Sequence, residues 1–134
     1  MIRAAADRAP FVFSIRPRFV ALLLAGTKTV EFRTRRPSVA AGDTILIYET
    51  APRSLVVASA IVGDVIVGEP AEVWRATGGR GGIDRETFDA YFAHRRTAVA
   101  VELAVTPLVT PLALPAGQHA PQAWARWSGP WPLE

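Results

Sequence analysis

The chain has 134 residues, of which half are apolar and a fifth are charged, and its formal net charge at pH 7 is +3. This length fits one domain that buries roughly two thirds of its unfolded surface. The absence of cysteine excludes disulfides and thiolate zinc sites, and the two histidines, His94 and His119, lie far apart in the sequence, so we expect no metal site and no cofactor.

The sequence favours a cytoplasmic protein over a membrane or secreted one. The longest apolar run, residues 19–25, is too short to cross a bilayer. The amino terminus lacks the apolar core of a signal peptide. Residues 1–10 are polar and rich in alanine, which predicts a loose leader before a domain that spans residues 11–134.

A strand, a helix and a second strand are predicted in the first quarter of the chain. Residues 11–15 read as a short strand. Pro17 suits the first turn of a helix and Gly26 suits the left-handed position that closes one, so we expect an apolar helix between them. Residues 29–33 then alternate as a strand.

The alternation in this second strand brings polar side chains together. Val30 and Phe32 should face one side, and the other side should carry Thr29, Glu31 and Arg33, with Lys28 at its mouth. Glu31 and Arg33 could pair there and form a polar cleft floor. The alternative is an exposed surface ion pair, worth about 0–1 kcal/mol.

Lys28 is the single lysine among fifteen basic residues, and the other fourteen are arginine. A lysine that is retained in such a composition indicates a function that needs a compact charge, with a pKa that the environment can shift, in place of a planar guanidinium. Residues 16–53 hold seven basic and three acidic side chains, so the first half of the chain carries the positive field. This field permits nucleic acid as a partner without requiring it.

The middle of the chain predicts more sheet. A turn at residues 42–43 precedes a strongly apolar strand at 44–48, and a second turn at 52–54 precedes a long β-branched run at 55–67. The run is interrupted at Gly63-Asp64. A long strand that is buried on both sides or bent at a glycine is typical of a small closed barrel.

Two short helices and one further strand are predicted next. Residues 70–76 should form a helix with Trp74 on its inner face, and the glycine-rich residues 78–82 a flexible loop. Asp84 should cap a helix whose Phe88, Tyr91 and Phe92 share a face. Residues 97–105 alternate as a strand, with Glu102 on its solvated side.

The last segment of the chain is rich in tryptophan, with Trp124, Trp127 and Trp131 close to Arg126. Aromatic side chains beside arginine can stack on nucleic-acid bases. The interpretation that we favour is a lid over one end of the barrel.

Several of these segments together resemble the ASCH domain of the PUA-like superfamily. The resemblance covers roughly residues 11–128 and rests on Ser14-Ile15-Arg16-Pro17, Gly26-x-Lys28-x-x-Glu31-x-Arg33, Gly42-Asp43-x-Ile45-Leu46-Ile47-Tyr48, Pro70-x-x-x-Trp74, the helix up to Phe92, and Pro121-Gln122. It implies an α+β fold, a small mixed β-barrel flanked by short helices.

The resemblance also implies a cleft beside the first helix that holds RNA or another nucleotide-containing ligand. The ligand-binding residues that it implies are Arg16, Lys28, Glu31, Arg33, Tyr48 and Gln122. Functional labels in this family rest largely on fold analogy.

Two branches of related proteins are enzymes. One removes the acetyl group of acetylated cytidine with a lysine that activates a threonine, but here Glu31 stands at the position of that threonine. Another cuts RNA; on that route Lys28 would stabilise phosphate charge and Glu31 would take a proton from a ribose hydroxyl.

Three functions therefore compete. We favour an RNA- or nucleotide-binding module. A hydrolase that uses Lys28 and Glu31 as catalytic residues, either a ribonuclease or an amidohydrolase of modified nucleosides, is the alternative. The third possibility is a protein-interaction domain that uses the tryptophan segment.

Overall fold

The computed structural model describes residues 8–133. In chain order its elements are β1 (Phe11–Ile15), α1 (Pro17–Leu24), β2 (Val30–Arg33), β3 (Thr44–Glu49), β4 (Leu55–Gly68), α2 (Pro70–Thr77), the 3-10 turn η2 (Gly78–Gly81), α3 (Arg85–Tyr91), β5 (Ala98–Leu112) and β6 (Trp124–Arg126). No helix in the described part of the chain is long and apolar enough to cross a membrane.

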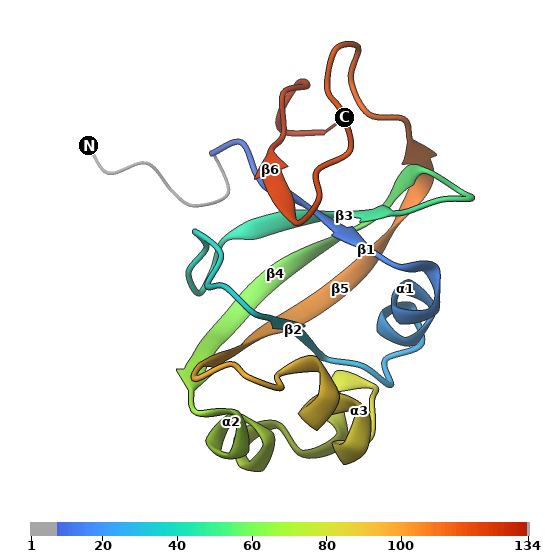
Figure 1. Cartoon of the computed structure of the whole chain (residues 1–134). Coiled ribbons are helices and arrows are strands. Elements are labelled where there is room, and N and C mark those ends of the chain that lie inside the picture. The colour runs from blue at the N-terminus through green and yellow to red at the C-terminus, as the bar shows by residue number, and fades with distance from the viewer. Residues whose placement is uncertain (1–7, 134) are drawn as a thin grey trace.

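The strands form one mixed sheet in the order β2-β5-β4-β3-β1-β6 (Figure 1). β1 and β3 run parallel, whereas every other neighbouring pair is antiparallel. This confirms the predicted α+β class and the barrel-like mixed sheet. Because the strand order is linear, with β2 and β6 at its two edges, the sheet is an open half-barrel rather than a closed barrel.

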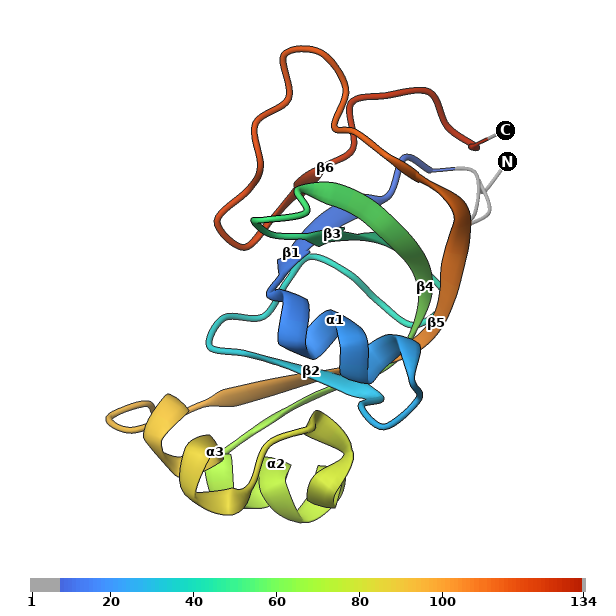
Figure 2. The same cartoon turned by 90° about the vertical axis from the view of Figure 1, so that its right-hand side faces the viewer.

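The helices lie at two places on this sheet. α1 connects β1 to β2 and covers the main core through Val20 and Leu23. α2 and α3 lie together at one end of the molecule, and the segment that follows β5 lies at the other end (Figure 2). Val73 of α2 and Phe88 of α3 pack with Val30 and Phe32 of β2 in a second cluster.

The two longest strands differ from their predicted form. β4 runs through Gly63 and Asp64 without a break, and the predicted interruption is a register shift against β5 between Val62 and Val65. β5 extends to Leu112 instead of ending at Val105. Its prolines, which argue against a strand, are tolerated because Pro107 lies next to another register shift in the β4 ladder.

The glycine-rich residues 78–82, predicted as a flexible loop, are for the most part regular in structure. Residues 78–81 form a 3-10 turn in which Gly81 is buried. A side chain at Gly81 would collide with Phe32, since a Cβ added there would lie 2.0 Å from the ring atom Cε2. Gly81 therefore allows the turn to pack closely against β2.

The tryptophan-rich segment closes one side of the sheet, which agrees with the predicted lid. Trp127 is 5 % exposed and packs with Val12, Tyr48 and Val56 in a third cluster. Its indole N–H donates to the carbonyl of Pro130. Trp124, on β6, stacks on Phe13 with the ring centroids 6.1 Å apart.

Residues 1–7 of the predicted leader lie outside the described residues. Residues 8–10 contact the domain: Arg8 pairs with Asp43, and the Pro10 carbonyl accepts from the backbone N–H of Trp127 at 2.8 Å.

We predict that Trp127→Ala lowers the free energy of unfolding by about 3–5 kcal/mol, because it removes a large ring from a closed cluster. Urea denaturation followed by circular dichroism measures this change. Val109→Ala is the control, since Val109 is fully exposed and should change stability by less than about 0.5 kcal/mol. Equal midpoints for the two variants would contradict the lid.

Candidate functional site

A cleft of about 610 Å³ lies between α1, β2 and α3. Its size falls within the usual range for small-molecule sites. Residues from distant parts of the chain line this cleft, and these are Ser14, Ile15, Arg16, Arg18, Phe19, Lys28, Glu31, Phe32, Arg33, Thr50, Gly81, Ile83, Thr87, Tyr91, Pro121 and Gln122.

Lys28 lies at the floor of the cleft and is 3 % exposed, so it does not stand at the mouth as the sequence suggested. Its ammonium lies 2.7 Å from the Gly81 carbonyl oxygen and 3.2 Å from Glu31 Oε1. The rings of Phe19 and Phe32 flank it, with centroids at 5.0 and 5.7 Å. An ammonium carries three protons, so these two oxygens leave one donor for a ligand.

Glu31 lies between two cations. Its Oε1 faces Lys28, and its Oε2 accepts from Arg33 Nη2 at 2.9 Å. Arg33 Nη2 also donates to the Ser14 carbonyl at 3.2 Å, whereas its Nε is buried without a hydrogen-bond partner. The predicted pairing of Glu31 and Arg33 on one strand face is therefore present, and it is buried rather than exposed.

The local sequence explains why Lys28 points inward. α1 ends at Leu24, and Gly26 takes a φ of +79°, which turns the chain back. The Lys28 N–H then donates to the Leu22 carbonyl, and the Thr29 N–H donates to the Arg80 carbonyl at 2.8 Å. The start of β2 is thus tied to α1 on one side and to η2 on the other.

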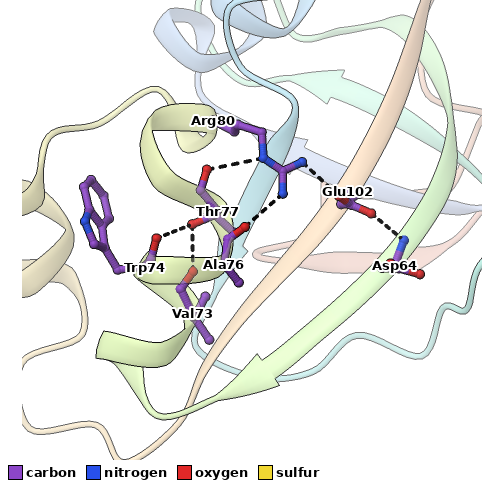
Figure 3. Close-up of polar contacts among 7 residues, drawn as sticks. All are labelled: Asp64, Val73, Trp74, Ala76, Thr77, Arg80 and Glu102. Atoms are coloured by element: carbon purple, nitrogen blue, oxygen red, sulfur yellow. Dashed lines mark hydrogen bonds and ion pairs between the residues drawn. The ribbon is translucent and has the colours of Figure 1, made fainter.

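The η2 turn that supplies the Gly81 carbonyl is held by Arg80 (Figure 3). The guanidinium of Arg80 donates to the carbonyls of Thr77 and Ala76 and, at 2.8 Å, to Glu102 Oε2. The other oxygen of Glu102 accepts the N–H of Asp64 at 3.0 Å. Glu102 is therefore not a freely solvated side chain: it joins β4 and β5 to the turn, and the hydrogen bond from Arg80 lowers its pKa.

Burial lowers the pKa of Lys28, because removing an ammonium from water disfavours its charged form. The carboxylate of Glu31 acts in the opposite direction, and the charge of Arg33 adds to the lowering. The net direction is downward. Lys28 is consequently a stronger acid than an ordinary lysine, which suits a group that exchanges or shares a proton.

Five of the six predicted ligand-binding residues line the cleft, namely Arg16, Lys28, Glu31, Arg33 and Gln122. Arg16 precedes α1 and is exposed. Gln122 reaches the cleft because β1 holds the neighbouring chain: Ser14 Oγ donates to the Pro121 carbonyl at 2.6 Å. Tyr48 is not among the lining residues and packs in the third cluster beside Trp127.

Sequence reasoning missed two parts of the cleft. The Gly81 carbonyl could not be anticipated, because a backbone acceptor leaves no side-chain signal. The sequence pattern places Tyr91 on an apolar face with Phe88 and Phe92, but Tyr91 is 48 % exposed and lines the cleft. Thr87, four residues earlier on the same helix, lines it too, and this i, i+4 spacing was an available signal.

Among residues 8–133, no group of three or more histidine, cysteine, aspartate or glutamate side chains is arranged to hold a metal ion. The cleft has cationic side chains of its own, Lys28 on the floor together with Arg16, Arg18 and Arg33.

We predict that Gly81→Ala destabilises the protein by about 1–3 kcal/mol, because the new methyl group must displace Phe32 or the turn. Gly79→Ala is the matched control on the same turn, since a Cβ there meets no atom within 4 Å. Thermal unfolding of both variants measures the difference. Indistinguishable transitions would show that the close approach of η2 to β2 does not matter.

This chain is similar to known proteins in sequence. The family model of the ASCH domain matches residues 13–107. A curated relative from Zymomonas mobilis subsp. mobilis, named ASCH domain-containing ribonuclease, is 32 % identical over 94 residues, and the match covers 70 % of this chain and 64 % of that protein. The chain thus matches somewhat less than two thirds of the length of this relative.

Solved structures share the fold of this chain. The crystal structure of ASCH from Zymomonas mobilis superimposes with a TM-score of 0.81 at 28 % identity and covers 90 % of this chain and 88 % of that one. A protein from Enterococcus faecalis V583, at 18 % identity and a TM-score of 0.53, covers 69 % of this chain and 72 % of that one and shares the fold alone. The chain belongs to the ASCH domain family and has the PUA-like fold.

Proposed function

We propose that this protein is a ribonuclease that cleaves RNA in the cleft, with Lys28 and Glu31 as its catalytic residues. The observation that carries the proposal is the convergence of Lys28, Glu31 and Arg33 on the floor of an open cleft. The relative named as a ribonuclease supports it. Cleavage therefore replaces simple binding as the function that we favour.

The proposed chemistry uses the ribose 2′-hydroxyl as the nucleophile. Glu31 takes the hydroxyl proton, the 2′-oxygen forms a bond to phosphorus, and the bond from phosphorus to the 5′-oxygen breaks. The leaving oxygen takes a proton from water, and the hydroxide that remains takes the proton from Glu31, which restores the carboxylate. The products are a 2′,3′-cyclic phosphate and a 5′-hydroxyl end.

The residues at the floor suit these roles. Each oxygen of Glu31 accepts one contact from a cation, which leaves each oxygen a further acceptor site for the hydroxyl proton. The third N–H of the Lys28 ammonium donates to a non-bridging phosphate oxygen, where negative charge develops. Arg16 and Arg18, both exposed at the start of α1, bind neighbouring phosphates.

A non-catalytic RNA-binding module is the second candidate. The observation in its favour is that both Lys28 and Arg33 already pair with Glu31, the group that would have to act as the base. Such a module would bind RNA with an affinity that falls steeply with salt, because phosphate contacts release counterions. It would leave the RNA intact.

We predict that the protein cuts single-stranded RNA to fragments with cyclic phosphate ends and that it leaves a chain with 2′-O-methyl riboses intact. Lys28→Met should lower kcat about 10²–10³-fold, since it removes the charge that faces the phosphate. Glu31→Gln should lower it about 10²–10⁴-fold by removing the base. Denaturing gels and mass spectrometry of the fragments measure both effects.

Glu69→Gln is the control for Glu31→Gln, because Glu69 is exposed and lies outside the cleft. Circular dichroism establishes that each variant is folded. RNA that binds but stays uncut by the wild type would favour the binding module. If the Lys28→Met variant cleaved RNA as fast as the wild type, Lys28 would not be a catalytic residue and the proposed site would be wrong.

We also predict that kcat/KM falls in alkaline solution, and that this fall begins at a pH below the pKa of an ordinary lysine. As the pH rises through the lowered pKa of Lys28, the ammonium loses its proton and no longer stabilises phosphate charge. The profile is measured after subtraction of uncatalysed alkaline RNA hydrolysis. A rate that stays constant across the alkaline range would exclude Lys28 as the charged group.

A further inference from the structure

One aromatic ring in the cleft has no role in the chemistry described above. Three aromatic side chains line the cleft, namely Phe19, Phe32 and Tyr91. Phe19 and Phe32 flank the Lys28 ammonium, and Phe32 is 7 % exposed. Tyr91 is 48 % exposed, so it is the lining aromatic that offers the most free ring surface.

The position of Tyr91 is fixed by the core behind it. The residue ends α3, and its ring meets Phe92 in a T-shaped contact with centroids 4.8 Å apart. Phe92 is 3 % exposed and packs with Phe88 in the second cluster. A ring held from one side by a buried neighbour can act as a platform, because little conformational freedom remains to be lost when a ligand binds.

Charged groups lie within electrostatic range of this platform. Arg33, Glu31, Arg16 and Arg95 all lie near enough to act electrostatically on the phenol of Tyr91, whose pKa is raised chiefly by burial. Three of these four groups are cations. A planar ring beside several guanidinium groups offers a face for a base and charges for the phosphates on either side of it.

We propose that Tyr91 is the base-stacking residue of the cleft and that it selects unpaired nucleotides. The proposal rests on the proposed function and names the part of the RNA that the same site recognises. In an A-form duplex each base is stacked on its neighbours, so its face is unavailable to a side chain, whereas a base in a single strand can turn out onto an aromatic ring. Specificity for unpaired RNA therefore follows from the ring.

The test compares Tyr91→Phe, which keeps a ring, with Tyr91→Leu, which keeps apolar bulk without one. Asp89→Asn is the control, an exposed side chain on the same helix that lies outside the cleft. The probe is a 2′-O-methyl single-stranded oligonucleotide, which the proposed chemistry cannot cut, so binding is measured apart from cleavage. Its affinity is measured by fluorescence anisotropy.

The expected result is that Tyr91→Leu weakens binding about 5- to 100-fold, while Tyr91→Phe and Asp89→Asn stay within about 2-fold of the wild type. On cleavable RNA, the Tyr91→Leu substitution should raise KM and leave kcat nearly unchanged. An oligonucleotide in which every nucleotide is abasic should bind wild type and Tyr91→Leu equally, and a duplex should not compete with the single strand.

Three outcomes overturn the proposal: equal binding of the single strand by wild type and Tyr91→Leu, no binding of the single strand by the wild type, or competition by the duplex as strong as that by the single strand. The failure of the proposed function looks different. In that case, wild type and Lys28→Met would leave cleavable RNA equally intact, whatever the Tyr91 variants do in the binding measurement.

Discussion

The buried ammonium of Lys28 is the constraint around which the site is arranged. A charge that is 3 % exposed is tolerated only when oxygens replace the water that it has lost. Here the replacements are the Gly81 carbonyl and the Glu31 carboxylate, which come from η2 and β2. Each must stay within hydrogen-bonding distance, so the glycine turn, the second strand and the end of α1 are fixed relative to one another. The cleft is the open space that remains in front of this arrangement.

Residues that do not touch Lys28 also help to hold its ammonium in position. The Gly81 carbonyl is in place because Arg80 holds η2 to Glu102, and Glu102 in turn accepts the backbone N–H of Asp64. The connection joins the helical end of the molecule to the two longest strands. A support of this kind suits the RNA cleavage proposed above, since donors that are already in position need no reorganisation when charge develops on a phosphate.

The sequence predicted the parts of the fold and site that arise from local patterns. Alternation in residues 29–33 correctly placed Glu31 and Arg33 on one face, and the motif around Lys28 indicated the ASCH domain. The errors have non-local causes. The glycines at 78–82 suggested a flexible loop, but residues 78–81 form a 3-10 turn in which Gly81 packs against Phe32. Tyr48 lies on β3 as predicted, but no local pattern reveals that its side chain packs beside Trp127 and not in the cleft.

The late position of Pro121 and Gln122 in the sequence has a consequence for translation. A ribosome makes a chain from its amino end. Pro121 and Gln122 come at least 30 positions after every other residue that lines the cleft, the last of which is Tyr91. The hydrogen bond from Ser14 to the Pro121 carbonyl can therefore form only after nearly all of the described chain has been translated. Until then the cleft lacks one wall. A nascent chain surrounded by ribosomal RNA thus acquires its complete site late, when this segment leaves the exit tunnel.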